Sequence, residues 1–143
     1  MQTAINTNDN VNEEQKPQVL VDCYHATVAT SMGDKYSEIV LYGHDDGSEE
    51  LVVYEKGFSD VKEVSHSYPL AEKISDEIMR FVHREKVDTW LKMNYFNPIC
   101  GANYVIKYYD GNKLVRIPSE KMPADGIKTF YRLCEILRSY ISD

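Results

Sequence analysis

Residues 36–57 read YSEIVLYGHDDGSEELVVYEKG, and this stretch decides the fold. Two apolar runs rich in β-branched and aromatic residues lie on either side of Asp46 and Gly47, a dipeptide typical of the tight turn between antiparallel strands. The stretch therefore predicts a β-hairpin. With Asp46 and Gly47 at the centre of the turn, Glu38 is expected opposite Glu55. Like charges opposite each other destabilise a strand pair, so this pair hints at a functional role.

Further strands are predicted on both sides of this hairpin. Residues 19–29 have the β-branched and aromatic content of a first strand, and residues 61–68 alternate in the manner of a short strand. A second hairpin is expected from residues 103–109 and 113–118, joined through Asp110–Gly111. Its alternation gives one apolar face for the core and one polar face for solvent.

Two helices complete the predicted fold. Pro69 and Pro123 suit the first turn of helices over about residues 69–85 and 123–141, because proline is favoured at the first helical position. Apolar residues recur at helical spacing along one side of each segment. We therefore predict an α+β fold, an antiparallel sheet of about five to six strands with two helices on one face, in the order β-β-β-(β)-α-β-β-α.

The composition is that of a globular protein, with 143 residues of which 43% are hydrophobic and 27% charged. Residues 1–17 are rich in Asn, Gln, Thr and Glu and are expected to form a disordered N-terminal arm. Residues 18–143 then form a single α+β domain. The sequence has no run with the length and apolar character of a membrane span, and its start lacks the segments of a signal peptide. We expect a cytoplasmic protein.

The chemically reactive residues form no catalytic motif. Cys23, Cys100 and Cys134 are odd in number and include no CxxC pair, which argues against a disulfide framework and against zinc-finger spacing. Cys23 and His25 fall on one face of a strand but have no further ligands nearby in sequence. Phosphate-binding, dinucleotide-binding, zinc-protease and hydrolase motifs are absent from the sequence. We therefore expect no catalytic residues, no metal and no cofactor, and the sequence favours a protein that is not an enzyme.

The charge is unevenly distributed along the chain. The formal net charge is −7, with 13 acidic and 4 basic residues over residues 1–65 but 10 acidic and 12 basic residues over residues 66–143. An acidic half disfavours binding to phosphate backbones, so nucleic acid is not expected as a direct partner. No membrane partner is expected either, since the sequence has no spanning run. The acidic half attracts a basic protein surface, including that of a nucleic-acid-binding protein. The acidic side chains also keep a small protein soluble without any partner.

Protein binding is the leading functional hypothesis. We expect a module of the inhibitor or immunity type, of bacterial or phage origin, that covers a basic surface of its partner with its acidic N-terminal half. Charge pairing by acidic residues and apolar contact by two tyrosines would hold that partner. The expected partner-binding residues are Glu38, Tyr42, Asp45, Asp46, Glu49, Glu50, Tyr54 and Glu55.

Two alternatives remain open. The first is a small ligand-binding or enzymatic domain with a pocket around residues 90–116, suited to an anionic or aromatic molecule. Its expected lining is Trp90, Tyr95, Cys100, Lys107 and Arg116. The second is a structural protein that self-associates through a free edge of its sheet.

Overall fold

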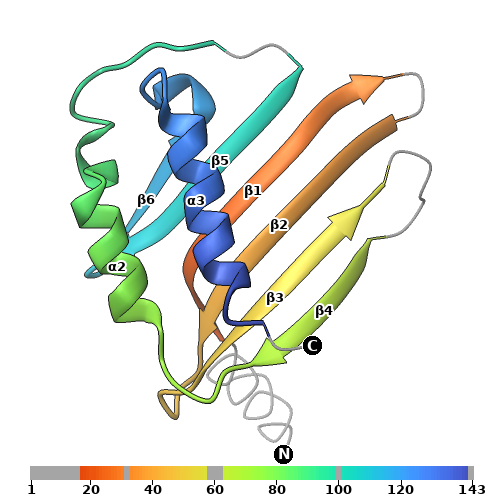
Figure 1. Ribbon diagram of the computed structural model, residues 1–143, viewed down its shortest axis with the longest axis vertical. Coiled ribbons are helices and arrows are strands. Elements are labelled where there is room, and N and C mark those ends of the chain that lie inside the picture. Colours follow the sequence, from red (N-terminus) through yellow and green to blue (C-terminus); the bar gives the residue numbers. More distant parts are fainter. Residues whose placement is uncertain (1–16, 31–32, 58–62, 99–100, 142–143) are drawn as a thin grey trace, which may run out of the picture.

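Six antiparallel strands of the described chain form one open sheet in the order β4-β3-β2-β1-β5-β6, and two helices pack on one face of it (Figure 1). The computed structural model describes residues 17–30, 33–57, 63–98 and 101–141. The fold is α+β, and its strands and helices follow the predicted order. The strands are β1 (Gln18–Thr30), β2 (Gly33–Gly43), β3 (Glu49–Lys56), β4 (Val64–Pro69), β5 (Ala102–Asp110) and β6 (Lys113–Pro118); the helices are α2 (Ser75–Arg84) and α3 (Gly126–Arg138), with short 3-10 helices at Val87–Thr89 and Ser119–Lys121.

Strand β1 occupies the centre of the sheet. It pairs with β2 on one side and with β5 on the other, both antiparallel. The remaining strand pairs in the described chain join neighbours in sequence, so β1 links the meander β2-β3-β4 to the hairpin β5-β6. The predicted N-terminal arm lies outside the described residues except for Pro17.

The core lies between the sheet and the two helices. Alternate strand residues face the helices, as the two-residue period of a strand requires. Four helix residues pack against these strand residues and are nearly or fully buried: Ile78, Phe81, Phe130 and Leu133. The strand residues of this cluster are Val21, Cys23, Ile39, Leu41, Leu51, Val53, Ile106, Tyr108 and Ile117.

The first hairpin forms where expected, but its predicted register is wrong by one residue. The loop between β2 and β3 is closed by His44 N–H donating to Ser48 O at 2.8 Å, and Gly47 N–H donates to His44 O at 2.9 Å. Three residues therefore span the turn, and Gly47 takes the left-handed conformation with φ 89°. A left-handed glycine at the third loop position is typical of three-residue hairpins, whereas the prediction assumed a two-residue loop.

The corrected register separates the two acids that were expected to pair. Glu38 lies opposite Tyr54, and Glu55 lies opposite Ser37. A shift of one residue moves a side chain to the other face of the sheet. Glu38 and Glu55 therefore lie on opposite faces, and the predicted like-charge pair does not exist.

The second hairpin has the predicted faces, and both helices begin later than predicted. Ile106 lies opposite Ile117 in the core, and Lys107 lies opposite Arg116 on the other face. Pro69 is the last residue of β4, not the first of a helix, and α2 begins at Ser75. Helix α3 runs from Gly126 to Arg138, inside the predicted range. Neither helix has the length and apolar character needed to cross a membrane.

Candidate functional site

The sheet face that carries no helix in the described chain, hereafter the open face, holds a group of acids and tyrosines. Their positions alternate with those of the core residues, and the register places them side by side on β1, β2 and β3. The side chains of this group are Asp22, Tyr24, Tyr36, Glu38, Tyr42, Glu50 and Tyr54.

Asp22 is the centre of this group. Its side chain is 6% exposed although the residue is an acid, and its Oδ1 atom has no hydrogen-bond partner among the described residues. It lies opposite Val40 on one side and Lys107 on the other. A buried polar atom without a partner carries a free-energy cost, and such an atom at a surface-facing position is suited to a ligand donor.

Glu38 shares a proton with Asp22. Burial, together with the hydrogen bond to Asp22 and the charge of Asp22, raises the pKa of Glu38 to about 8, and nearby Lys107 opposes the rise. At neutral pH the Glu38 carboxyl is therefore protonated, and its O–H group donates a hydrogen bond to Asp22. The protonated Glu38 carboxyl therefore adds no negative charge to the open face at neutral pH.

Tyrosines surround the two acids. The hydroxyl groups of Tyr42 and Tyr54 are hydrogen-bonded at 2.8 Å, and burial raises the pKa of Tyr42 above its usual range. The rings of Tyr24 and Tyr36 lie 5.9 Å apart, and the Tyr36 hydroxyl donates to Glu63. Rings with negative faces beside these acids are suited to holding an ammonium or guanidinium group.

The structure divides the predicted acidic set. Glu38, Tyr42, Tyr54 and Glu50 lie on the open face, where Glu50 Oε1 is 2.6 Å from His44 Nε2. The other members lie elsewhere, each for a different reason.

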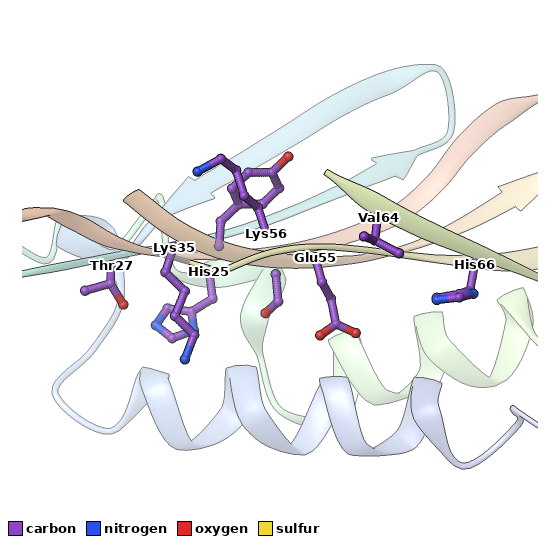
Figure 2. Close-up of a pocket in the computed structure, with 10 residues that line it drawn as sticks. His25, Thr27, Lys35, Glu55, Lys56, Val64 and His66 are labelled. Carbon is purple, nitrogen blue, oxygen red and sulfur yellow. The ribbon is translucent and has the colours of Figure 1, made fainter. Parts of the chain in front are cut away.

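Asp45 and Asp46 lie in the loop, where Asp46 Oδ1 accepts hydrogen bonds from the Ser48 backbone and hydroxyl. Glu49 is buried, and its Oε1 accepts from the backbone N–H groups of Ile74 and Ser75, at 2.7 and 3.1 Å. It fixes the start of α2, and its Oε1 is already occupied by these two donors. Glu55 lies on the helix side of the sheet (Figure 2).

The residues of the predicted alternative pocket do not form one site. Trp90 is 4% exposed within the core, and Tyr95 packs against the core. Lys107 and Arg116 lie opposite each other on the open face. Cys100 lies outside the described residues. A cavity of about 380 Å³ does lie in the predicted range, bordered by Pro98 and Val105 among others, but Arg116 is the only member of the predicted lining that borders it in the described chain.

A second polar region lies near the ends of β1, β2, β3 and β4, in a pocket of about 460 Å³. His25, Lys35 and Glu55 extend from the helix side of the sheet, while Lys56 extends from the opposite side (Figure 2). Burial, and after it the charge of Lys35, lowers the pKa of His25. His25 is therefore neutral at pH 7 and stacks on Tyr104 with ring centroids 4.4 Å apart.

Sequence reasoning missed Asp22 and the His25 pocket. One signal for Asp22 was present, since it is the only charged residue in the run VLVDCYHATVA. A charge within an otherwise apolar central strand is buried or functional. Cys23 and His25, weighed as a two-ligand edge, face the helices, and no group of three or more His, Cys, Asp and Glu side chains in the described ranges is arranged to hold a metal ion.

Comparisons of the sequence with models of known protein families and with curated proteins give no significant match. The functional argument therefore depends on the site itself.

Proposed function

We propose that this chain is a cytoplasmic, non-enzymatic protein-binding module of the inhibitor or immunity type, and that it holds a basic segment of its partner on the open face. A lysine or arginine of that segment meets Asp22 and Glu38, and the surrounding tyrosines contact its aliphatic stem and its charge. The acidic half of the chain brings the partner to this face by long-range attraction.

The observation that carries the proposal is the Oδ1 atom of Asp22, which has no hydrogen-bond partner in the part of the chain that the structure describes. A cationic N–H donor would donate a hydrogen bond to this oxygen and would also stabilise the negative charge of Asp22 and Glu38. Lys107, which lies directly opposite Asp22 on β5, and Arg116, which lies opposite Lys107 on β6, repel a cation. The basic group of the partner therefore lies over β1 and β2, and an acidic group of the partner suits the β5–β6 end.

Titration with defined peptides tests this function. The probes are two capped peptides of equal length, one alternating lysine with serine and one alternating glutamate with serine, and calorimetry measures their affinity for the intact chain. The lysine peptide is expected to bind and the glutamate peptide is not. Asp22→Asn and Glu38→Gln are each expected to weaken binding of the lysine peptide by about tenfold, since each removes one charge-assisted hydrogen bond.

The matched control is Glu135→Gln, which removes an exposed acid on α3, away from the open face. Its affinity is expected to equal that of the unmodified chain. Thermal melting of every variant verifies that the fold is retained. Equal binding of both peptides contradicts the proposal, because the site would then not select a cation. Equal loss of affinity in Glu135→Gln and Asp22→Asn also contradicts it, because net charge alone would then account for binding.

A further inference from the structure

Two cysteines from distant parts of the sequence meet beneath the helix layer. Cys23 on β1 faces α3, and Cys134 on α3 faces the sheet, where the two thiols are hydrogen-bonded to each other. Both border a small cavity of about 90 Å³ that is also lined by His25, Tyr131 and Arg138. The binding function proposed for the open face uses neither cysteine.

The two thiols differ in their surroundings. Cys23 is 1% exposed, and its hydrogen bond to Cys134 together with burial raises its pKa well above the usual value. The hydrogen bond donated by Cys23, and after it the charge of Arg138, lowers the pKa of Cys134, against the effect of burial. Cys134 is also the more exposed of the two, and since an accessible thiolate is the reactive form of cysteine, these differences favour Cys134 as the nucleophile of the pair.

A small reagent has a route to Cys134. Cys134 is partly exposed, and its cavity shares His25 and Ser37 with the open pocket of about 460 Å³ at the ends of the strands. Hydrogen peroxide is small enough to enter this cavity, whereas a bulky thiol reagent is too large. Oxidation-sensitive cysteines combine thiolate character, access and a neighbouring second thiol, and all three are present here.

We propose that Cys23 and Cys134 form a peroxide-sensitive thiol pair that closes to a disulfide between β1 and α3. The Sγ atom of Cys134 attacks one oxygen of hydrogen peroxide, the O–O bond breaks, and Cys134 becomes a sulfenic acid while the second oxygen leaves as water. The Sγ atom of Cys23 then attacks Cys134 Sγ, the S–O bond breaks, and the departing hydroxide takes the Cys23 proton to form a second water. Two thiols are oxidised to one disulfide, and one peroxide is reduced to two waters.

Alkylation of the reduced, unmodified chain provides the first test and requires no variant of the pair. Iodoacetamide is applied to the native protein, and mass spectrometry of peptides follows each cysteine. Cys134 is expected to react at least about tenfold faster than Cys23, because its thiolate fraction and its exposure are both larger. Faster alkylation of Cys23 would overturn the assignment of the nucleophile.

Peroxide treatment provides the second test, in a Cys100→Ser background that leaves only the two cysteines of the pair. The expected product has lost two hydrogen atoms and contains a peptide that links Cys23 to Cys134. With Cys23→Ser added, the sulfenic acid on Cys134 persists and is trapped by dimedone. With Cys134→Ser added, Cys23 is expected to stay unlabelled.

Circular dichroism melting establishes that each variant is folded before labelling. If both thiols remain reduced at peroxide concentrations that oxidise the urea-unfolded chain, the proposal is overturned. Dimedone labelling of Cys23 in Cys134→Ser at the rate seen for Cys134 would also overturn it, because Cys134 would then have no special reactivity. Neither result bears on the peptide titration of the open face, so the two proposals fail separately.

Discussion

Glu49 shows how burial changes the role of an acidic side chain. In the sequence it belongs to the acidic run around the first hairpin, but in the fold its carboxylate accepts two backbone N–H groups at the start of α2. Helix N-termini leave such donors without partners inside the helix, and a carboxylate also suits the positive end of the helix dipole. Reversal of its charge would therefore test folding and not partner binding.

Glu49→Ala is expected to lower the free energy of unfolding by roughly 2 kcal/mol, because it leaves two helix-end donors without an acceptor. Glu49→Gln keeps an oxygen acceptor and should cost less. Urea denaturation measures both. The control is Glu72→Ala, an exposed acid in the segment before α2, which is expected to change stability little. A loss in Glu49→Ala no larger than that in Glu72→Ala would show that the cap contributes nothing.

Glu38 makes stability depend on pH. Its pKa is about 8 in the folded protein, above the ordinary value of 4.5, so the folded state binds more protons than the unfolded state between these two values. Stability therefore falls as pH rises from 4.5 to 8, and the loss is complete above pH 8.

Glu38→Gln removes this pH dependence. The variant is expected to gain stability relative to the unmodified chain as pH rises, reaching roughly 1–2 kcal/mol near pH 9 after a discount for the partial exposure of Glu38. Denaturation curves at intervals from pH 5 to pH 9 follow the difference. Glu55→Gln, on the helix side of the same sheet, is the control and should run parallel to the unmodified chain. Parallel curves for Glu38→Gln itself would refute the shared proton.

At the scale of elements, the sequence predicts which segments form strands better than it predicts how they pair. The apolar runs on both sides of Asp46 and Gly47 are strong hairpin signals, yet a loop of two residues and a loop of three residues fit the same letters. The choice depends on Gly47 taking a positive φ and on Asp46 accepting hydrogen bonds from Ser48. The local interactions that favour a two-residue loop and those that favour a three-residue loop are of similar energy. The turn sequence alone therefore does not determine the register.

Gly47→Ala is expected to lower the free energy of unfolding by about 1 kcal/mol, since a side chain disfavours the left-handed conformation. The nearest atoms to an added Cβ belong to Lys73, at 3.4 Å, so backbone strain and not crowding accounts for the loss. Gly47→Asn should cost less because asparagine tolerates this conformation. Thermal or urea melts rank the three proteins, and an alanine variant as stable as the asparagine variant would contradict the strained turn.

The starts of the helices were harder to predict than their apolar stripes. Proline at a helix start and proline at the end of an edge strand look alike in sequence, and Pro69 belongs to the second kind. The predicted stripe was Leu70, Ile74, Ile78, Phe81 and Val82. The last four residues are buried, whereas Leu70 precedes α2 and is partly buried against the core. The buried face of a helix is specified by many residues together. The start of a helix, in contrast, depends on a single hydrogen-bond acceptor that is distant in sequence, such as Glu49.

At the scale of the whole molecule, the candidate site depends on a pairing between distant segments. Asp22 becomes buried because β1 lies between β2 and β5, and the strand β5 begins at residue 102. The sequence placed Glu38, Tyr42 and Tyr54 in the binding set from local charge and strand content. It could not place Asp22 beside Glu38, or Lys107 opposite Asp22, without the strand order.

The proposed binding function has its own dependence on pH. A cationic peptide stabilises the ionised form of Glu38, so affinity for the lysine peptide is expected to rise about tenfold between pH 6.5 and 8.5, with release of a proton. Calorimetry in two buffers of different ionisation enthalpy measures both quantities. Glu38→Gln should bind more weakly and show no rise. A rise of the same size in Glu38→Gln would assign the dependence to another group.

The order of elements along the chain also determines when the apolar side of the sheet is covered during synthesis. Strands β2, β3 and β4 each pair with the preceding strand, so this half of the sheet can assemble as the chain leaves the ribosome. The residues Phe130, Leu133 and Leu137, which close the core over it, belong to α3, the last helix of the described chain. A nascent chain that lacks α3 therefore exposes the apolar face of a sheet that has already formed. During that interval of translation the polypeptide is most prone to aggregate and most in need of a chaperone.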